Sequence, residues 1–135
     1  MLTDKELIKK AASVINPKKI GDSSMGDVGC ALISEDDNIY TGVCIETPCG
    51  MGYCAEHNAI GTMINEGEYK IKKIVAVWKD EEGSLQVIPP CGRCREFIRQ
   101  VNEENLDTKV IVSEDENVKL KELLPYHDWF ADLSE

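Results

Sequence analysis

The chain has 135 residues, of which 42% are hydrophobic and 30% charged, and this length fits one compact domain spanning residues 1–135. It carries 25 acidic and 15 basic residues, a formal net charge of −10, and such a surface repels the phosphates of nucleic acids. No apolar run approaches the roughly 20 residues of a membrane-spanning helix, and the N-terminus lacks a signal-peptide pattern. We therefore expect a cytoplasmic protein that binds no membrane and no nucleic acid.

The first third of the chain predicts a helix followed by two strands. Thr3 and Glu6 have the spacing of a capping box, and apolar residues recur after them at helical intervals. Apolar runs over 28–33 and 39–45 predict two strands. Because only a short acidic turn separates these strands, we expect them to form an antiparallel hairpin.

A second helix and a central strand follow. The segment 47–53 is rich in Gly and Pro and is predicted to be a loop. Apolar residues share one face of a predicted helix over 54–66, which Gly67 ends. The run over 74–78 is apolar throughout, as expected for a strand that is covered on both faces.

The remainder of the chain continues this alternation. Residues 85–88 predict the end of a strand, and Pro89 with Pro90 enforces an extended entry to the next helix. A strand over 110–112 and a short helix over 119–124 precede an aromatic tail. Since strands alternate with helices after the hairpin, we expect right-handed crossovers, a mixed sheet and a three-layer α/β/α sandwich.

Six cysteines are the unusual feature of the composition, and in the cytosol they would stay reduced. Cys30 and Cys44 lie within apolar runs and are typical of small core residues. Three others stand at predicted helix starts, where the helix dipole and free N–H groups stabilise thiolates. These are Cys54, Cys91 and Cys94.

The three cysteines at helix starts have the pattern of a metal site. Cys91 and Cys94 can hold one ion from a single helical turn, and Cys54 can add a third ligand from the other helix. Three protein ligands leave the fourth tetrahedral position open, which is typical of catalytic rather than structural zinc. Glu56 lies two residues from Cys54, where it can take a proton from a water that zinc acidifies and pass it to a substrate.

The chain resembles the cytidine deaminase family of zinc enzymes. The resemblance rests on Cys54-Ala-Glu56 and Pro90-Cys91-x-x-Cys94, and it extends to the predicted strands before them. The segments PCGRCR and ELLP are similar to those of blasticidin S deaminases in particular. The resemblance implies a cytidine deaminase-like sandwich, Zn²⁺ as cofactor, Glu56 as the catalytic residue, a small-molecule substrate and a homotetramer.

The positions that match the family's substrate-binding residues depart from its pattern. Cys44 and Glu46 stand where nucleoside deaminases commonly carry Asn-x-Glu to hold the ribose hydroxyls, so the carboxylate is kept and the amide is lost. Gly26 stands where an aromatic residue would pack near the base, and we expect it to leave room there. Ala55 is implied as a further substrate contact. These differences predict weak recognition of plain cytidine and tolerance of bulkier analogues.

Three more side chains are expected around the zinc ligands. His57 stands where tetrameric relatives often carry an Arg that offsets the charge of the thiolates; the alternative is a histidine packed on the helix. Arg93 and Arg95 either face solvent, or one of them neutralises a site whose net charge is about −1 with three thiolates bound.

Other interpretations of these residues stay open at this point. A structural zinc with Cys49 or His57 as fourth ligand, or a redox-active CxxC pair, would explain the cysteines without catalysis. In the tail, Tyr126, Trp129 and Phe130 either pack on the domain or cover a neighbour's pocket.

The sequence as a whole predicts an aminohydrolase that releases ammonia from a cytosine nucleoside or nucleoside-like compound. A blasticidin S-type deaminase is the alternative within this class, and a non-catalytic, zinc-stabilised binding protein is the alternative outside it. The net charge and the lack of a basic, aromatic-rich stripe disfavour editing of DNA or RNA. Pterin and guanine substrates stay open.

Overall fold

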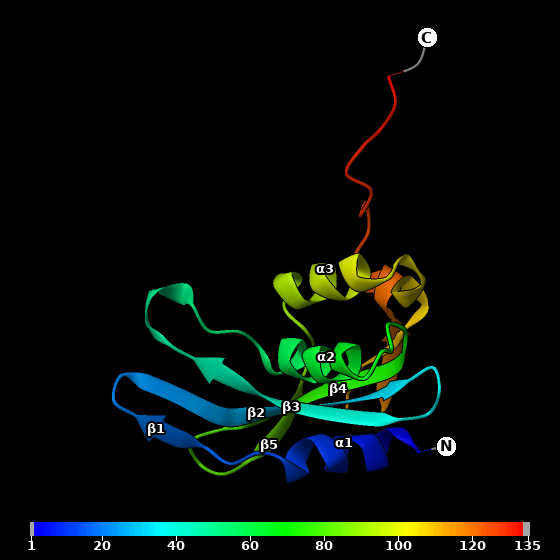
Figure 1. The fold of residues 1–135 in the computed structure, drawn as a ribbon. Coiled ribbons are helices and arrows are strands. Elements are labelled where there is room, and N and C mark those ends of the chain that lie inside the picture. Colours follow the sequence, from blue (N-terminus) through cyan, green and yellow to red (C-terminus); the bar gives the residue numbers. More distant parts are fainter. Residues whose placement is uncertain (1, 134–135) are drawn as a thin grey trace.

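The structure is a computed structural model that describes residues 2–133 and arranges them in three layers (Figure 1). A seven-stranded sheet forms the middle layer of the described chain. Helix α1 (Asp4–Ser13) covers one face of the sheet, and α2 (Ala55–Asn65) and α3 (Gly92–Val101) cover the other. This arrangement confirms the predicted α/β/α sandwich.

The sheet contains antiparallel and parallel neighbours. Its strands are β1 (Lys18–Ile20), β2 (Ser23–Ser34), β3 (Ile39–Glu46), β4 (Ile71–Lys79), β5 (Leu85–Ile88), β6 (Lys109–Ser113) and β7 (Glu116–Lys119). β2 pairs antiparallel with β3 on one side and with β4 on the other, which confirms the predicted hairpin. β4 and β6 run parallel, with α3 in the crossover between them, so the sheet is mixed as expected.

Some short elements differ from the sequence-based expectation. The helix predicted over 119–124 is a single 3₁₀ turn, Leu120–Leu123, and two further 3₁₀ turns span Pro48–Gly50 and Glu103–Asp107. The strands β1 and β7 were not predicted. All three residues of β1 and three of the four in β7 are exposed, so neither strand has the apolar alternation that identifies a half-buried strand.

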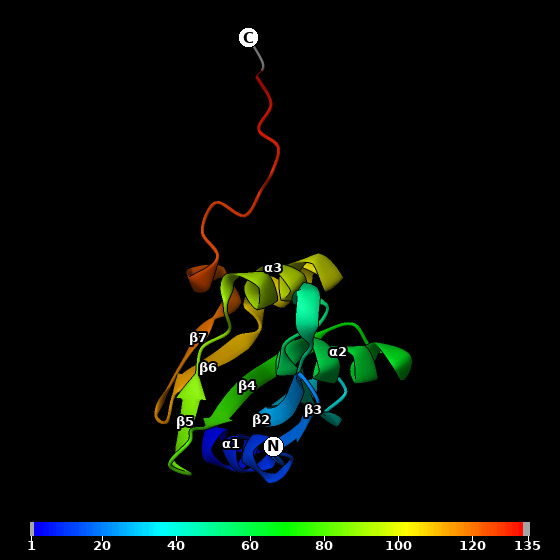
Figure 2. The same cartoon turned by 90° about the vertical axis from the view of Figure 1, so that its left-hand side faces the viewer.

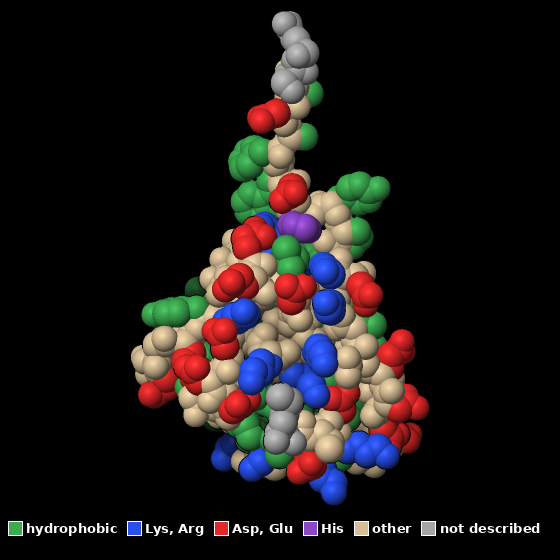
Figure 3. All heavy atoms as spheres, turned by 90° about the vertical axis from the view of Figure 1, so that its right-hand side faces the viewer, with side chains coloured by type: hydrophobic (Ala, Val, Ile, Leu, Met, Phe, Trp, Pro, Cys, Tyr) green, Lys and Arg blue, Asp and Glu red, His purple; other side chains and the backbone are tan. Residues whose placement is uncertain are grey.

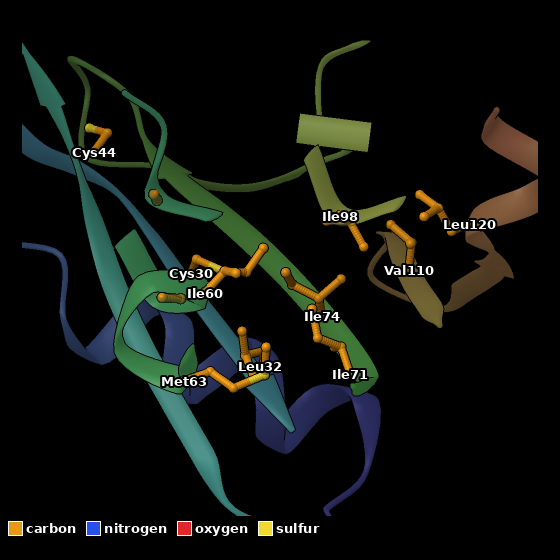
Figure 4. Packing of buried hydrophobic residues seen from close by; sticks show 12 residues of the cluster. Cys30, Leu32, Cys44, Ile60, Met63, Ile71, Ile74, Ile98, Val110 and Leu120 are labelled. Atoms are coloured by element: carbon orange, nitrogen blue, oxygen red, sulfur yellow. The ribbon is translucent and has the colours of Figure 1, made fainter. Parts of the chain in front are cut away.

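Two hydrophobic cores lie on the two faces of the sheet. Cys30 and Leu32 of β2 pack in the cluster that includes Met63 of α2, as Figure 4 shows. Ala31 and Ile33 point to the other face and pack in the cluster under α1. Because β2 and β4 are covered on both faces, they form the stable centre against which the helices α2 and α3 are positioned.

Helix α2 approaches β3 closely through a glycine. A Cβ atom at Gly42 would lie 2.5 Å from the backbone nitrogen of Ala59, a separation that real Cβ atoms do not show. Nearby, the side-chain amide of Asn58 donates a hydrogen bond of 3.1 Å to the carbonyl oxygen of Val43. These contacts hold α2, and with it the residues at its N-terminus, against β3.

The C-terminal segment projects away from the rest of the chain (Figures 1 and 2). Trp129 lies against Arg99 of α3, whose guanidinium carbon is 5.2 Å from the centroid of the indole ring. Tyr126 and Phe130 are almost fully exposed. Trp129 is thus anchored on the domain, whereas the other two tail aromatics face solvent.

The face shown in Figure 3 carries Lys and Arg side chains interspersed with Asp and Glu side chains. Among the described residues, Lys72 forms an ion pair with Asp37 and Lys73 forms one with Asp4. None of the helices in the described part of the chain has the length and apolar character needed to cross a membrane.

Candidate functional site

Two helices present cysteines at their N-termini, close together in space. Cys54 is the N-cap of α2 and Cys91 is the N-cap of α3, both with extended backbone, while Cys94 lies in the first turn of α3. The three sulfur atoms lie within 4.8 Å of one another. The Sγ atoms of Cys91 and Cys94 are 3.9 Å apart, and all three cysteines are free thiols. The structure therefore brings together the three residues expected to bind zinc.

The chemistry of this cysteine cluster suits a soft divalent cation. Burial raises the pKa of Cys54 and of Cys94, and the negative charge of Glu56 adds to the effect at Cys94. Burial also acts on Cys91, but hydrogen bonds from the backbone N–H groups of Cys94 and Arg93 outweigh it and lower the pKa of Cys91. Three sulfur donors at one point favour zinc over magnesium or calcium, and a cation would compensate the thiolates.

The cluster lacks the fourth protein ligand of a structural zinc site. Among the described residues, no further His, Cys, Asp or Glu joins the three cysteines. Cys49, one of the two residues considered as a fourth ligand, is exposed on the 3₁₀ turn Pro48–Gly50. A tetrahedral ion held by three thiolates keeps one position for water or substrate, which is the arrangement of catalytic zinc.

Glu56 lies in the first turn of α2, beside the cysteine cluster, and only 5% of its surface is exposed. Burial raises the pKa of its carboxyl group. None of the ion pairs among residues 2–133 includes Glu56. The carboxyl group is thus held next to the site of metal chemistry without a cationic partner, where it can accept and release a proton.

The three side chains expected around the ligands lie in different places. Nδ1 of His57 is 3.6 Å from Sγ of Cys94, and its ring stacks on Phe97 with a centroid distance of 4.1 Å. Arg93 lines the cavity in front of the cysteines. Arg95 instead donates hydrogen bonds to the carbonyl oxygens of Pro90, at 2.7 Å, and Leu123, at 3.2 Å. Arg95 therefore holds the backbone that precedes Cys91.

A cavity of about 540 Å³ opens in front of the cysteine cluster. That volume lies within the range of small-molecule sites. The sequence-predicted residues that line it are Cys44, Glu46, Cys54, Ala55, Glu56, Cys91, Arg93 and Cys94. His57 and Arg95 are not among the lining residues. The end of β3, the N-termini of α2 and α3 and the loops before these helices therefore converge on one site.

Gly26 does not have the place that the sequence suggested. It is buried, its φ is +87°, and a Cβ atom there would lie 2.2 Å from the carbonyl oxygen of Asn16. Gly26 is absent from the residues that line the cavity, so the expectation that it leaves room beside the base is wrong. A glycine is needed here because two backbone segments meet, with Asn16 donating a hydrogen bond of 2.8 Å to the Gly26 carbonyl oxygen.

The next residue, Asp27, belongs to the site surroundings and was missed by sequence reasoning. Its Oδ1 atom accepts a hydrogen bond of 3.0 Å from the Sγ–H group of Cys44. The signal that could have indicated it is the glycine inside an apolar strand pattern, which often marks a β-bulge. Tyr53, Ile88 and Pro89 also line the cavity without having been predicted to do so.

Comparisons with known proteins agree with this geometry. The family model of the cytidine and deoxycytidylate deaminase zinc-binding region matches residues 1–112. Blasticidin-S deaminase from Bacillus cereus is 35% identical over 100 residues, which cover 70% of this chain and 70% of that protein. A cytidine deaminase from Sporosarcina psychrophila is 39% identical over 74 residues, or 54% of this chain and 52% of that protein.

Solved structures of cytidine deaminases share the fold. The enzyme from Bacillus anthracis superposes with a TM-score of 0.74 at 23% identity, covering 93% of this chain and 89% of that one. The enzyme from Mycobacterium leprae gives a TM-score of 0.65 at 24% identity, covering 90% and 93%.

The chain belongs to the cytidine and deoxycytidylate deaminase family defined by this zinc-binding region. It is a zinc-dependent hydrolytic deaminase, with a nucleoside or nucleoside-like compound as its class of substrate. The predicted cofactor and the predicted type of reaction are thereby confirmed. A non-catalytic binding protein, the alternative outside the class, is not supported.

Proposed function

We propose that Cys54, Cys91 and Cys94 hold the zinc ion and that Glu56 is the catalytic residue for removal of the amino group from a cytosine ring. The observation that carries this proposal is the position of a buried carboxyl group, with no ion-pair partner among the described residues, beside three converging thiols in one cavity. Zinc, when bound, supplies water that is activated at neutral pH. Glu56 takes one proton from that water and delivers it to N3 of the ring, and then takes the second proton from the oxygen added at C4 and delivers it to the departing amino group.

The proposed reaction is a hydrolysis of the C4–N4 bond of the cytosine ring. Water adds its oxygen at C4 of the cytosine ring, the C4–N4 bond breaks, and ammonia leaves as C4 becomes a carbonyl carbon. The cavity walls orient the ring, with Ala55 next to Glu56 as a proposed substrate contact. Cys44 and Glu46, at the end of β3, face the group attached to N1 in this proposal.

The substrate proposed is a cytosine nucleoside whose sugar differs from plain ribose. The loss of the amide at Cys44 supports this choice, since an amide both donates and accepts hydrogen bonds. Blasticidin S, a cytosine compound with a modified sugar, is a second candidate because the Bacillus cereus blasticidin-S deaminase is 35% identical. Ammonia release from cytidine, deoxycytidine, cytosine and blasticidin S, measured with the zinc-loaded chain, separates these candidates. Release from none of the four would contradict the proposal.

We further propose that the protein is a cytoplasmic homotetramer. The six cysteines are all free thiols, which suits a reducing compartment. Tyr126, Phe130 and Leu133 are at least 88% exposed, and exposed apolar groups of this size are typical of surfaces that bind a partner. Light scattering at micromolar concentration tests the assembly. A monomer would contradict it.

A further inference from the structure

A β-bulge in β2 lies opposite Cys44. Between Met25 and Gly29 the chain advances four residues in β2, while the partner strand β3 advances only two, from Ile45 to Val43. The extra residues kink β2 and re-aim its side chains, as bulges beside active sites commonly do. Asp27 belongs to these extra residues, and the bulge brings its carboxylate against the Cys44 thiol.

The hydrogen bond between Cys44 and Asp27 fixes what the sulfur offers to the cavity. Sγ of Cys44 lies 3.0 Å from Oδ1 of Asp27, and a carboxylate only accepts, so the thiol proton points to Asp27. Burial of Cys44 and this hydrogen bond both raise the pKa of the thiol, which keeps it protonated. Towards the cavity, Cys44 therefore presents only the lone pairs of sulfur.

The neighbouring cavity residue on the same face of β3 has the same character. Glu46 lies two residues from Cys44, so both side chains point to one side of the sheet, and both line the cavity. A carboxylate has acceptors and no donor. None of the ion pairs among residues 2–133 includes Asp27 or Glu46, and Arg93, which also lines the cavity, forms no ion pair with either carboxylate. The side chains of Cys44 and Glu46 therefore form a patch of the cavity wall that accepts hydrogen bonds and donates none, and Glu46 supplies a carboxylate.

We propose that Asp27 is a positioning residue that acts through Cys44, and that together with Glu46 it selects a cytosine compound whose sugar carries an amino group. An ammonium group offers three donors and a positive charge, which match these acceptors and the negative carboxylates. A hydroxyl group offers one donor and carries no charge, so it gains less from them. The same wall disfavours a phosphate at this position. This inference rests on the proposed function and names the class of substrate for it.

The test compares two substrates in three forms of the full-length, zinc-loaded chain. The value of kcat/KM is measured for 3′-amino-3′-deoxycytidine and for cytidine with the wild type, Asp27→Asn and Asp22→Asn. Asp22 lies exposed in the turn of the β1–β2 hairpin, so its substitution removes the same charge away from the cavity. The wild type is expected to favour the amino compound by about tenfold, as for a hydrogen bond to a charged group. Asp27→Asn should remove most of this preference, and Asp22→Asn should keep it.

The dependence on salt gives a second readout that needs no variant. If the preference comes from charge, the ratio of the two kcat/KM values for the wild type should fall as salt rises from low concentration to about 0.5 M. A purely structural role of Asp27 would change Tm and both substrates alike, without moving this ratio.

The outcomes separate the inference from the proposed function. If the zinc-loaded wild type deaminates neither of these two compounds, and deoxycytidine, cytosine and blasticidin S are also inert, the proposed function is wrong. If cytidine is deaminated as fast as the amino compound, and the ratio responds neither to Asp27→Asn nor to salt, the role of Asp27 is overturned while the deaminase function stands.

Discussion

The imidazole of His57 lies 3.6 Å, measured from Nδ1, from the sulfur of Cys94, and it does not line the substrate cavity. The ring is stacked on Phe97, which fixes its orientation. His57 thus approaches the proposed zinc ligand from outside the cavity. An N–H donor in this position stabilises negative charge on the sulfur without contacting the substrate.

Replacing His57 by Phe should therefore weaken zinc binding. The Phe ring can keep the stack on Phe97 but offers no donor to Cys94, and loss of such a contact costs about 10- to 100-fold in metal affinity. Competition with a chromophoric chelator measures the change. His57→Asn, which restores a donor but loses the stack, serves as the comparison. Equal zinc affinity of wild type and His57→Phe would show that the contact has no effect on the metal.

Replacing Cys44 by Asn should raise kcat/KM for plain cytidine. The Asn amide can donate a hydrogen bond to the sugar, whereas the Cys44 thiol donates its proton to Asp27. One such hydrogen bond is worth about 1 kcal/mol, or roughly fivefold in kcat/KM. Cys49→Asn is the matched control, because Cys49 is exposed and has a φ of +63°, a conformation that Asn tolerates. No gain in cytidine turnover for Cys44→Asn would show that the sugar does not lie against β3.

Replacing Gly42 by Ala should destabilise the protein and impair zinc retention together. The new Cβ atom would meet the backbone of Ala59 at 2.5 Å, which pushes α2, with Cys54 at its N-cap, away from β3. Gly61→Ala in the same helix is the control, because no atom lies within 4 Å of its Cβ position, and Ala gains about 0.5–1 kcal/mol over Gly inside a helix. Thermal unfolding should thus give a lower Tm for Gly42→Ala and a higher Tm for Gly61→Ala. The zinc content should fall in Gly42→Ala only. Tolerance of Gly42→Ala would contradict the packing described.

The lowered pKa of Glu68 leads us to expect a loss of folding stability in acid. Hydrogen bonds from Ser34, Tyr40 and Asn38 lower the pKa of Glu68 to about 2 from its ordinary value of 4.5. Since the folded-state pKa is the lower one, this stabilisation is complete above pH 4.5 and is lost as the pH falls towards 2. Urea unfolding of wild type and Glu68→Gln at pH 7 and pH 3 tests this: the difference in stability between the two should shrink at pH 3. A difference independent of pH would contradict it.

The hydrogen bond between Tyr40 and Glu68 raises the pKa of Tyr40, whereas it lowers the pKa of Glu68. The bond from its hydroxyl group to Glu68, with burial, raises the pKa of Tyr40 to about 12. Ultraviolet titration of the phenols should therefore leave Tyr40 protonated after the exposed tyrosines have ionised.

Much of this site could be predicted from the sequence because its main parts are local in the chain. Cys91 and Cys94 are three residues apart on one helix, and Glu56 is two residues from Cys54, so each motif fixes its own geometry. The two motifs meet because β3 and β4 both run antiparallel to β2 and end at one edge of the sheet, and β5 then folds back beside β4 and leads into α3.

The contacts that could not be predicted join residues distant in the sequence. The pairing of Asp27 with Cys44 depends on a bulge between Met25 and Gly29, and neither hydrophobic alternation nor composition fixes the register of a bulged strand. Gly26 was misplaced for the same reason, since its neighbour Asn16 comes from a segment outside the strand pattern. The bonds of Arg95 to Pro90 and Leu123 likewise depend on loops that carry no periodic signal.

The substitution Glu56→Gln tests the central claim most directly, because Gln keeps the shape of the side chain but cannot carry the proton. Zinc content and ammonia release from the best cytosine substrate are measured on the same preparation. We predict about one zinc ion per chain, as in the wild type, and a fall in kcat of about 10²- to 10⁴-fold, the usual contribution of a general acid–base group. Ammonia release at the wild-type rate from zinc-loaded Glu56→Gln would contradict the account.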